Sequence, residues 1–268
     1  MRKVCLALLF STVVAAGPAF AARCGGDFNT FVGAMSQEAS AAGVSQAVIS
    51  QALSGVTQDQ AVLNFDRRQR YTFNKSFEQY VSTRVGSGRI NTGRAMLQRN
   101  AALLSQIEAK FGVPRQIIVA IWGLETDFGH GDMGKQQVIR TLATLAHDCR
   151  RTDLFQGELL AALKILQRGD LPLREMIGAG AGEIGQTQFL PSSYIKYGVD
   201  FDGDGRVDLR HDVADVLAST ANLLHTNGFK MGAPYGEGTP NFEAMHEWNH
   251  ALVYRKTIAY FADQLVGR

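Results

Sequence analysis

The chain has 268 residues, of which 46% are hydrophobic, 19% charged and 9% aromatic. This is the composition of a folded globular protein, and it excludes a disordered, collagen-like or coiled-coil chain. The formal net charge is +2, and it falls to zero without Arg2 and Lys3, so bulk charge gives no support for nucleic-acid binding.

Residues 1–21 are predicted to be a secretory signal peptide. A basic start at Arg2 and Lys3 precedes an apolar run too short to cross a bilayer, and Ala19-Phe20-Ala21 is an A-x-A cleavage site. Arg23 stands where a lipoprotein would need a small residue before its cysteine. We therefore expect an exported protein without a membrane anchor.

Export changes the meaning of the cysteines. Removal of Cys5 leaves Cys24 and Cys149, and an even pair in an oxidising compartment favours one disulfide over two free thiols. The bond would close a long loop, which is worth about 4–5 kcal/mol in the chain-entropy model.

The hydrophobic pattern predicts a chain that is helical nearly throughout. No long run alternates between apolar and polar residues, so a large sheet is not expected. The segment 171–177 is also interpreted as helical. The main helices are expected over 36–56 with a break at Gly43, 94–111, 117–124, 155–166, 213–224 and 248–265.

Glu125 is embedded in a strongly apolar helical segment, with Trp122 three residues earlier on the same face. A carboxyl against apolar and indole surface loses hydration when it ionises, so its pKa rises and it can deliver a proton near neutral pH. Asp127 does not share that face. The local pattern leaves two readings open, a catalytic acid and a solvent-facing acid at a helix end.

A glycine-rich stretch over 178–185 contains G-x-G-x-x-G. A dinucleotide fingerprint needs a strand before it, and the preceding segment is expected to be helical, so nucleotide binding is not favoured. The tightly bent backbone beside Gln186 and Gln188 is better suited to close contact with sugar hydroxyls.

Residues 246–250 match H-E-x-x-H, in which two histidines on one helical face ligate zinc and Glu247 serves as the base. Zinc needs a third protein ligand. No histidine follows His250, and Asp263 is the sole acid after it.

Asp200, Asp202 and Asp204 stand at positions 1, 3 and 5 of an EF-hand calcium loop, with Gly205 at position 6. Position 12 is His211 in place of glutamate, so Asp212 or Asp215 would have to supply the last carboxylate. The alternative is an Asx-rich turn that caps the next helix. Bound calcium would be structural, because no nucleophile lies nearby.

Taken together, several segments resemble the lytic murein transglycosylase B family, in the family's order and over nearly the whole mature chain. The resemblance implies a mainly α fold, with a lysozyme-like helical catalytic domain and a small subdomain that carries an EF-hand-like calcium loop. We expect an N-terminal helical part over 22–95, a catalytic part over 96–268 and the loop at 200–215. The segments that carry the resemblance are 120–129, 142–146, 181–194, 199–205, and Glu247-Trp248-Asn249 with Tyr254.

The resemblance implies cleavage of the β-1,4 bond between N-acetylmuramic acid and N-acetylglucosamine in peptidoglycan without water, which leaves a 1,6-anhydro end. Glu125 matches the single catalytic acid and base. No cofactor is implied for the chemistry, but structural calcium is. The implied substrate contacts are Gln188, Asn249 and Tyr254, with Glu183 and Trp122 expected beside them, and the implied calcium positions are Asp200, Asp202, Asp204, Arg206 and Asp215.

One departure concerns Gly180, where the family usually has an aromatic residue. One wall of the glycan cleft is therefore expected to be missing or supplied from elsewhere.

The expected partners are peptidoglycan strands, with other cell-wall enzymes as candidates, and no nucleic acid is expected to bind. The chain is expected to be a monomer in the periplasm of a Gram-negative bacterium. Three other functions stay open. They are a hydrolytic muramidase in which Glu183 or Asp127 activates water, a zinc peptidase that uses His246, Glu247 and His250, and a non-catalytic glycan-binding protein.

Overall fold

A computed structural model describes residues 22–68 and 76–268, so the predicted signal peptide lies outside the described residues. The described chain is mainly helical, as predicted. Its one sheet consists of two short antiparallel strands, β1 (Gln136–Gln137) and β2 (Ile177–Gly178), with Gln136 opposite Gly178. No described helix is long and apolar enough to serve as a membrane span.

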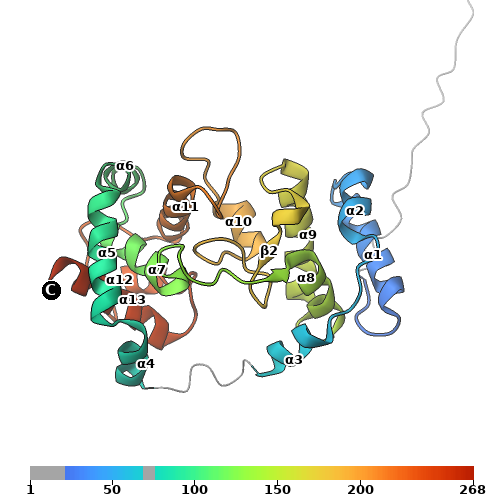
Figure 1. The fold of residues 1–268 in the computed structure, drawn as a ribbon, viewed down its shortest axis with the longest axis horizontal. Helices are drawn as coiled ribbons and strands as arrows, with labels where there is room; N and C mark the ends of the chain where they lie inside the picture. Colours follow the sequence, from blue (N-terminus) through green and yellow to red (C-terminus); the bar gives the residue numbers. More distant parts are fainter. Residues whose placement is uncertain (1–21, 69–75) are drawn as a thin grey trace, which may run out of the picture.

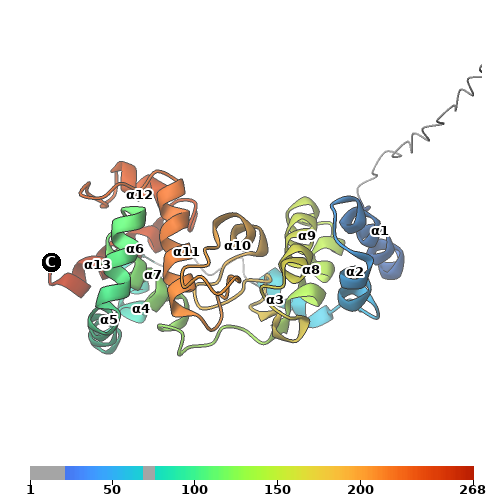
Figure 2. The same cartoon turned by 90° about the horizontal axis from the view of Figure 1, so that it is seen from above.

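The helices gather at the two ends of an elongated molecule (Figures 1 and 2). One end contains α1 (Phe28–Ala41), α2 (Gln46–Leu53), α3 (Gln60–Arg68), α8 (Val138–His147) and α9 (Thr152–Arg168). The other contains α4 (Phe77–Arg84), α5 (Ser87–Arg99), α6 (Ala101–Phe111), α7 (Arg115–Thr126), α11 (Val213–Thr226), α12 (Pro240–Ala244) and α13 (Leu252–Val266). Between them, α10 (Pro191–Tyr197) packs against both α9 and α11.

The helix α7 is the centre of the second group. Its residues from Ile117 to Leu124 are buried, which is typical of a helix that is apolar on all sides and covered by others. The helices α5, α6, α11 and α13 pack around it. A central helix of this kind is a rigid support for a side chain at its end.

The expected domain boundary between residues 95 and 96 falls inside α5, so it does not separate two units. Helix α5 packs on α7 and α13, whereas α1, α2 and α3 pack on α8 and α9. The helices α1, α2 and α3 thus lie at one end of the molecule, and α4 and α5 lie at the other.

Several predicted helices have different limits, and the one expected over 36–56 forms α1 and α2, which begin at Phe28 and Gln46. The 94–111 segment is divided at Asn100, whose side chain donates to the carbonyl of Met96. Residues 171–177 form a 3₁₀ turn over Leu173–Glu175 and then β2, after Pro172. The last helix begins at Leu252 in place of 248, because the Asn249 side chain accepts from the N–H of Ala251. Side-chain bonds of this kind compete with helical backbone bonds.

Cys24 and Cys149 form a disulfide, with their Cα atoms 5.0 Å apart. The bond ties the segment before α1 to the loop between α8 and α9. Within the same region, the N–H of Gly25 donates to the carbonyl of His147. The first helices are therefore joined to α8 and α9 covalently as well as by packing.

Candidate active site

Glu125 lies in the last turn of α7, where the helix ends sharply. Asp127 and Phe128 adopt left-handed backbone conformations, with φ of 51° and 61°, and their N–H groups donate to the carbonyls of Gly123 and Trp122. This pair of bonds closes the helix, and the Phe128 ring folds back at a right angle to the Trp122 indole. Glu125 is thus carried by a rigid helix end.

Two side chains from the C-terminal part of the chain hold the Glu125 carboxyl. The Tyr254 hydroxyl donates to Glu125 Oε1 at 2.5 Å, and Trp248 Nε1 donates to the same oxygen at 3.1 Å. Tyr254 lies on α13, and Trp248 lies on the turn before that helix. The position of the carboxyl is therefore determined by α7 and by a second, distant segment together.

The pKa of Glu125 is raised to about 7. Loss of hydration on burial is the largest cause, and the charge of Glu183 acts in the same direction. The hydrogen bonds from Tyr254 and Trp248 favour the charged form and oppose the rise. The last turn of a helix also disfavours an anion, because the negative end of the helix dipole is there. Such a carboxyl can both donate and accept a proton near neutral pH.

Glu125 lines a pocket of about 370 Å³ that several elements enclose. Three other predicted site residues, Glu183, Gln188 and Asn249, line the same pocket. The full lining is Glu125, Glu183, Gln188, Phe189, Leu190, Ser193, Leu223, Glu247, Trp248 and Asn249.

Local backbone bonds hold the predicted substrate contacts in place. Glu183 accepts from the N–H of Ala181 at 2.9 Å, and the Gln188 side chain donates to the carbonyl of Gly185 at 2.8 Å. Gln188 has a left-handed φ of 55°, which the tight 185–188 turn requires. These bonds order polar groups around the pocket before any ligand binds.

Trp122 does not reach the pocket, contrary to the expected substrate contact. Its side chain is 3% exposed, and its Nε1 donates to Gln186 Oε1 at 2.9 Å. Trp122 lies about one turn before Glu125, in the part of α7 that other helices cover, whereas Glu125 lies at the end of α7, which borders the pocket. Tyr254 is also buried, and it contacts Glu125 without lining the pocket. Trp122 and Tyr254 therefore hold Gln186 and Glu125 in place through hydrogen bonds and do not line the pocket.

The second acid of the α7 segment, Asp127, also lies away from the pocket. Its carboxylate pairs with Arg89 at 3.1 Å, and its side chain is 50% exposed. Within the described pocket, the carboxyls that accompany Glu125 are those of Glu183 and Glu247.

The H-E-x-x-H segment is a turn between α12 and α13 and not a helix. The rings of His246 and His250 lie 4.3 Å apart. In the described part of the chain, however, the one cluster of three or more potential metal ligands is in the 200–204 loop. The histidines therefore lack the third protein ligand of a catalytic zinc site, and Glu247 lines the pocket instead.

The 200–204 loop offers a donor set that fits calcium. Oxygen atoms of Asp200, Asp202 and Asp204 all lie within 4.8 Å of one another, and carboxylate oxygens are the ligands that calcium prefers. Asp215, on α11, accepts from the N–H groups of Phe201 at 2.7 Å and Asp208 at 2.8 Å. Asp215 thereby ties both sides of the loop to that helix.

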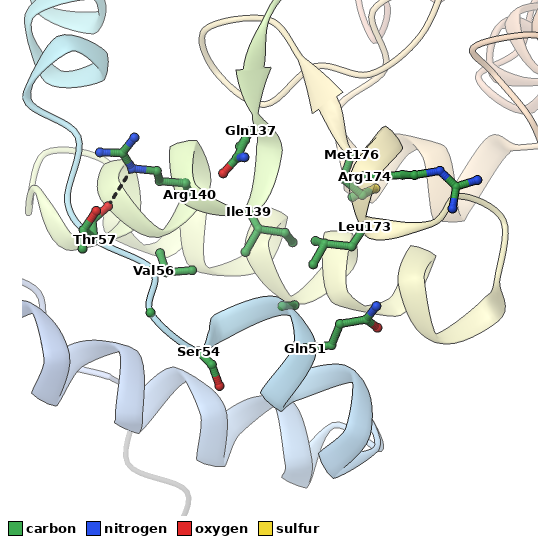
Figure 3. A pocket seen from close by; sticks show the side chains of 12 residues that line it. Gln51, Ser54, Val56, Thr57, Gln137, Ile139, Arg140, Leu173, Arg174 and Met176 are labelled. Carbon is green, nitrogen blue, oxygen red and sulfur yellow. Dashed lines mark hydrogen bonds between the residues drawn. The ribbon is translucent and has the colours of Figure 1, made fainter.

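A second, larger pocket of about 670 Å³ lies at the other end of the molecule (Figure 3). Its lining side chains include no carboxyl, histidine or cysteine. Arg140 turns toward the 54–57 segment and donates to the carbonyl of Thr57 at 3.0 Å. This pocket lacks a group that could act as an acid, so the active-site candidate remains the pocket around Glu125.

Two residues near the site were not singled out from the sequence. Trp248 belongs to one of the segments that carry the family resemblance, but no role was predicted for it. Its bond to Glu125 joins residues 123 positions apart, and no local sequence pattern could reveal such a bond. Phe65 lies over Gly180, where an added Cβ would meet the ring at 2.2 Å. An aromatic ring therefore does occupy this place, and it comes from α3.

The chain matches the Transglycosylase SLT domain family over residues 27–239. Membrane-bound lytic murein transglycosylase B of Escherichia coli (strain K12) is 43% identical over 124 residues, which are 46% of this chain and 34% of that protein. The chain thus spans about a third of the length of this curated relative.

Two solved structures are similar over most of the chain. SltB3 from Pseudomonas aeruginosa, in complex with NAG-NAM-pentapeptide, has a TM-score of 0.84 and 32% identity, over 91% of this chain and 81% of that one. The lytic transglycosylase Slt35 from Escherichia coli, in complex with calcium, has a TM-score of 0.76 and 25% identity, over 91% of this chain and 96% of that one.

Proposed function

The chain belongs to the transglycosylase SLT domain family, and from this premise we propose that it is a lytic transglycosylase that cleaves the glycan strands of peptidoglycan. The observation that carries the proposal is Glu125, a carboxyl with a pKa raised to about 7 that lines a pocket among polar side chains. Proton transfer by one positioned carboxyl is what this reaction needs.

The reaction uses Glu125 twice. The protonated carboxyl donates its proton to the glycosidic oxygen as the bond from that oxygen to C1 of N-acetylmuramic acid breaks. The C6 hydroxyl of the same sugar then attacks C1, and its proton goes to the Glu125 carboxylate. A C1–O6 bond forms, the carboxyl returns to its protonated state, and no water is consumed. Gln188, Asn249 and Glu183 are the side chains that would contact the sugars.

A hydrolytic muramidase is the nearest alternative. A second carboxyl that activates water is part of most glycosidase mechanisms, and Glu183 and Glu247 both line the pocket. The family favours the reaction without water, and the products of the two reactions differ in mass by one water molecule.

The test is digestion of peptidoglycan sacculi with the mature protein and with Glu125→Gln, followed by mass spectrometry of the released fragments. We expect anhydro products from the natural sequence and a rate about 10²–10⁴-fold lower for Glu125→Gln, because the proton donor is lost. Reducing-end products would identify a muramidase. Release of no glycan fragments would contradict both glycan-cleaving functions.

We also propose a structural calcium ion in the 200–215 loop. Asp200, Asp202 and Asp204 would supply carboxylate oxygens, Arg206 a main-chain oxygen as at position 7 of an EF-hand, and Asp215 the last carboxylate. The ion would stabilise the loop, and the proton transfers would not involve it.

Calcium binding is tested by thermal unfolding. With calcium a hundredfold above its dissociation constant, the midpoint is expected to rise by about 5–10 °C. Asp202→Asn is expected to remove that rise, whereas Asp153→Asn, a change to an exposed acid on α9, keeps it. An equal response of all three proteins would show that this loop does not bind the ion.

The cellular setting follows from the substrate. We propose that the chain is exported to the periplasm, that glycan strands are its partner and that other cell-wall enzymes are candidate partners.

A further inference from the structure

Phe65 is a large apolar side chain that the fold leaves exposed. Its neighbours on α3, Val62 and Leu63, are buried, whereas Phe65 is 42% exposed. The ring lies against the backbone of Gly180, and a Cβ added there would be 2.2 Å from Phe65 Cε1. Only glycine at residue 180 leaves room for the ring in this position.

The Phe65 ring forms one wall of a small surface pocket of about 290 Å³. Asp132, Lys135 and Gln136 line the same pocket, and all three are exposed. An aromatic face offers an apolar surface, and the carboxylate, ammonium and amide groups around it can exchange hydrogen bonds. A sugar ring has the matching chemistry, since its C–H face is apolar and its rim carries hydroxyl groups.

One segment, 179–189, contributes residues to both this pocket and the catalytic one. Ala179 and Gly180 line the Phe65 pocket, and Glu183, a few residues later, lines the catalytic pocket. The Gln188 side chain, in the catalytic pocket, lies 3.5 Å from the carbonyl of Met133, which follows Asp132. The two pockets are therefore neighbours along the 179–189 segment, and the loop that holds Asp132 contacts that segment at Gln188.

We propose that Phe65 is a sugar-stacking residue at an outer subsite, which binds a sugar of the glycan strand beyond those in the catalytic pocket. The proposal rests on the proposed function, because a polymer that occupies the catalytic pocket continues past these loops. Phe65 has no role in the proton transfers, since it lines a different pocket from Glu125. Its role is to bind long strands better than short ones.

The test measures binding in the Glu125→Gln background, so that cleavage does not interfere. Peptide-free N-acetylglucosamine oligomers of two to six sugars are titrated by calorimetry. Phe65→Ala is expected to weaken the longest oligomer by about 5–10-fold, the loss that an aromatic contact predicts, and to leave the shortest unchanged. Phe65→Trp should restore the affinity. Tyr260→Ala, which removes an exposed aromatic on α13, is the matched control.

A second variant tests the contact with Gly180. Gly180→Ala should displace the Phe65 ring and reproduce the loss of affinity seen with Phe65→Ala. The double variant should bind the longest oligomer no more weakly than either single variant, because both changes remove the same interaction. Additive losses of affinity in the double variant would contradict the contact between Phe65 and Gly180. Equal affinity of Phe65→Ala and its parent for every oligomer would contradict the outer subsite. Peptide-bearing strands are titrated in parallel, and a loss seen only with them would assign Phe65 to the stem peptide and overturn the proposal. If no oligomer binds at all, the outer-subsite proposal fails, whereas the proposed function is decided separately by the release of anhydro fragments from sacculi.

Discussion

The neighbours of Glu125 act on its pKa in opposite directions. Burial and the charge of Glu183 favour the neutral acid, whereas the donors Tyr254 and Trp248 favour the carboxylate. The balance lies at a pKa of about 7, where one group can serve first as acid and then as base.

This balance predicts the pH dependence of activity. In the proposed mechanism the free enzyme needs protonated Glu125, so kcat/KM should fall as the pH rises through about 7. Tyr254→Phe removes a bond to the charged form, which raises the pKa of Glu125 and moves the fall to higher pH. Glu183→Gln removes a nearby negative charge, which lowers that pKa and moves the fall to lower pH.

The measurement is the pH profile of kcat/KM for the parent and both variants on one soluble glycan. Opposite displacements of the alkaline limb are expected whatever the absolute rates. Displacement of both in the same direction would mean that Glu125 is not the group whose ionisation limits the reaction.

At the scale of elements, short side-chain contacts decide where helices stop. The apolar stripe of 94–111 continues through Asn100, but the side chain of that residue bonds to the carbonyl of Met96, and two helices result. Asn249 similarly delays the start of α13. That delay leaves Trp248 in a turn, where its indole can reach Glu125.

The helix α7 depends on a close approach at Gly123. A Cβ there would lie 2.6 Å from the Phe128 ring and 3.0 Å from Phe261. Gly123→Ala should therefore lower the free energy of unfolding by about 1–3 kcal/mol, although alanine ordinarily favours a helix.

The matched control is Gly157→Ala on α9, where an added Cβ meets nothing within 4 Å. That change should stabilise the protein by about 0.5–1 kcal/mol. Urea unfolding monitored by circular dichroism measures both. Stabilisation by Gly123→Ala would show that the end of α7 can move away from Phe128.

At the scale of the whole molecule, the candidate active site joins segments from distant parts of the chain. The end of α7, the 183–188 loop and the turn before α13 meet around one pocket. The disulfide lies at the opposite end, where it fastens the first helices to α8 and α9.

Loss of the disulfide should lower global stability and leave the pocket intact. The bond joins residues separated by 125 positions, and the chain-entropy model assigns such a loop about 4–5 kcal/mol. The double variant Cys24→Ala/Cys149→Ala is compared with the parent by urea unfolding and by activity at 25 °C. An unchanged unfolding midpoint would contradict this prediction.

The family, the helical class and Glu125 as the candidate acid could all be predicted from the amino-acid sequence. These depend on local information, since apolar periodicity, a carboxyl in an apolar helix and short motifs are read within a few residues. The family and the helical class are confirmed, and the disulfide is present. The roles of Gln188, Glu183 and Asn249 stay predictions.

The side of α7 that faces the pocket, and the residues that surround the pocket, could not be predicted from the sequence. Helical spacing puts Trp122 and Glu125 on one face, but whether that face meets solvent or core depends on the helices packed around it. The bond from Trp248 to Glu125 and the ring of Phe65 over Gly180 each join residues more than a hundred positions apart. Such contacts exist only once the chain has folded, because they are set by packing between elements and not by the residues next to them.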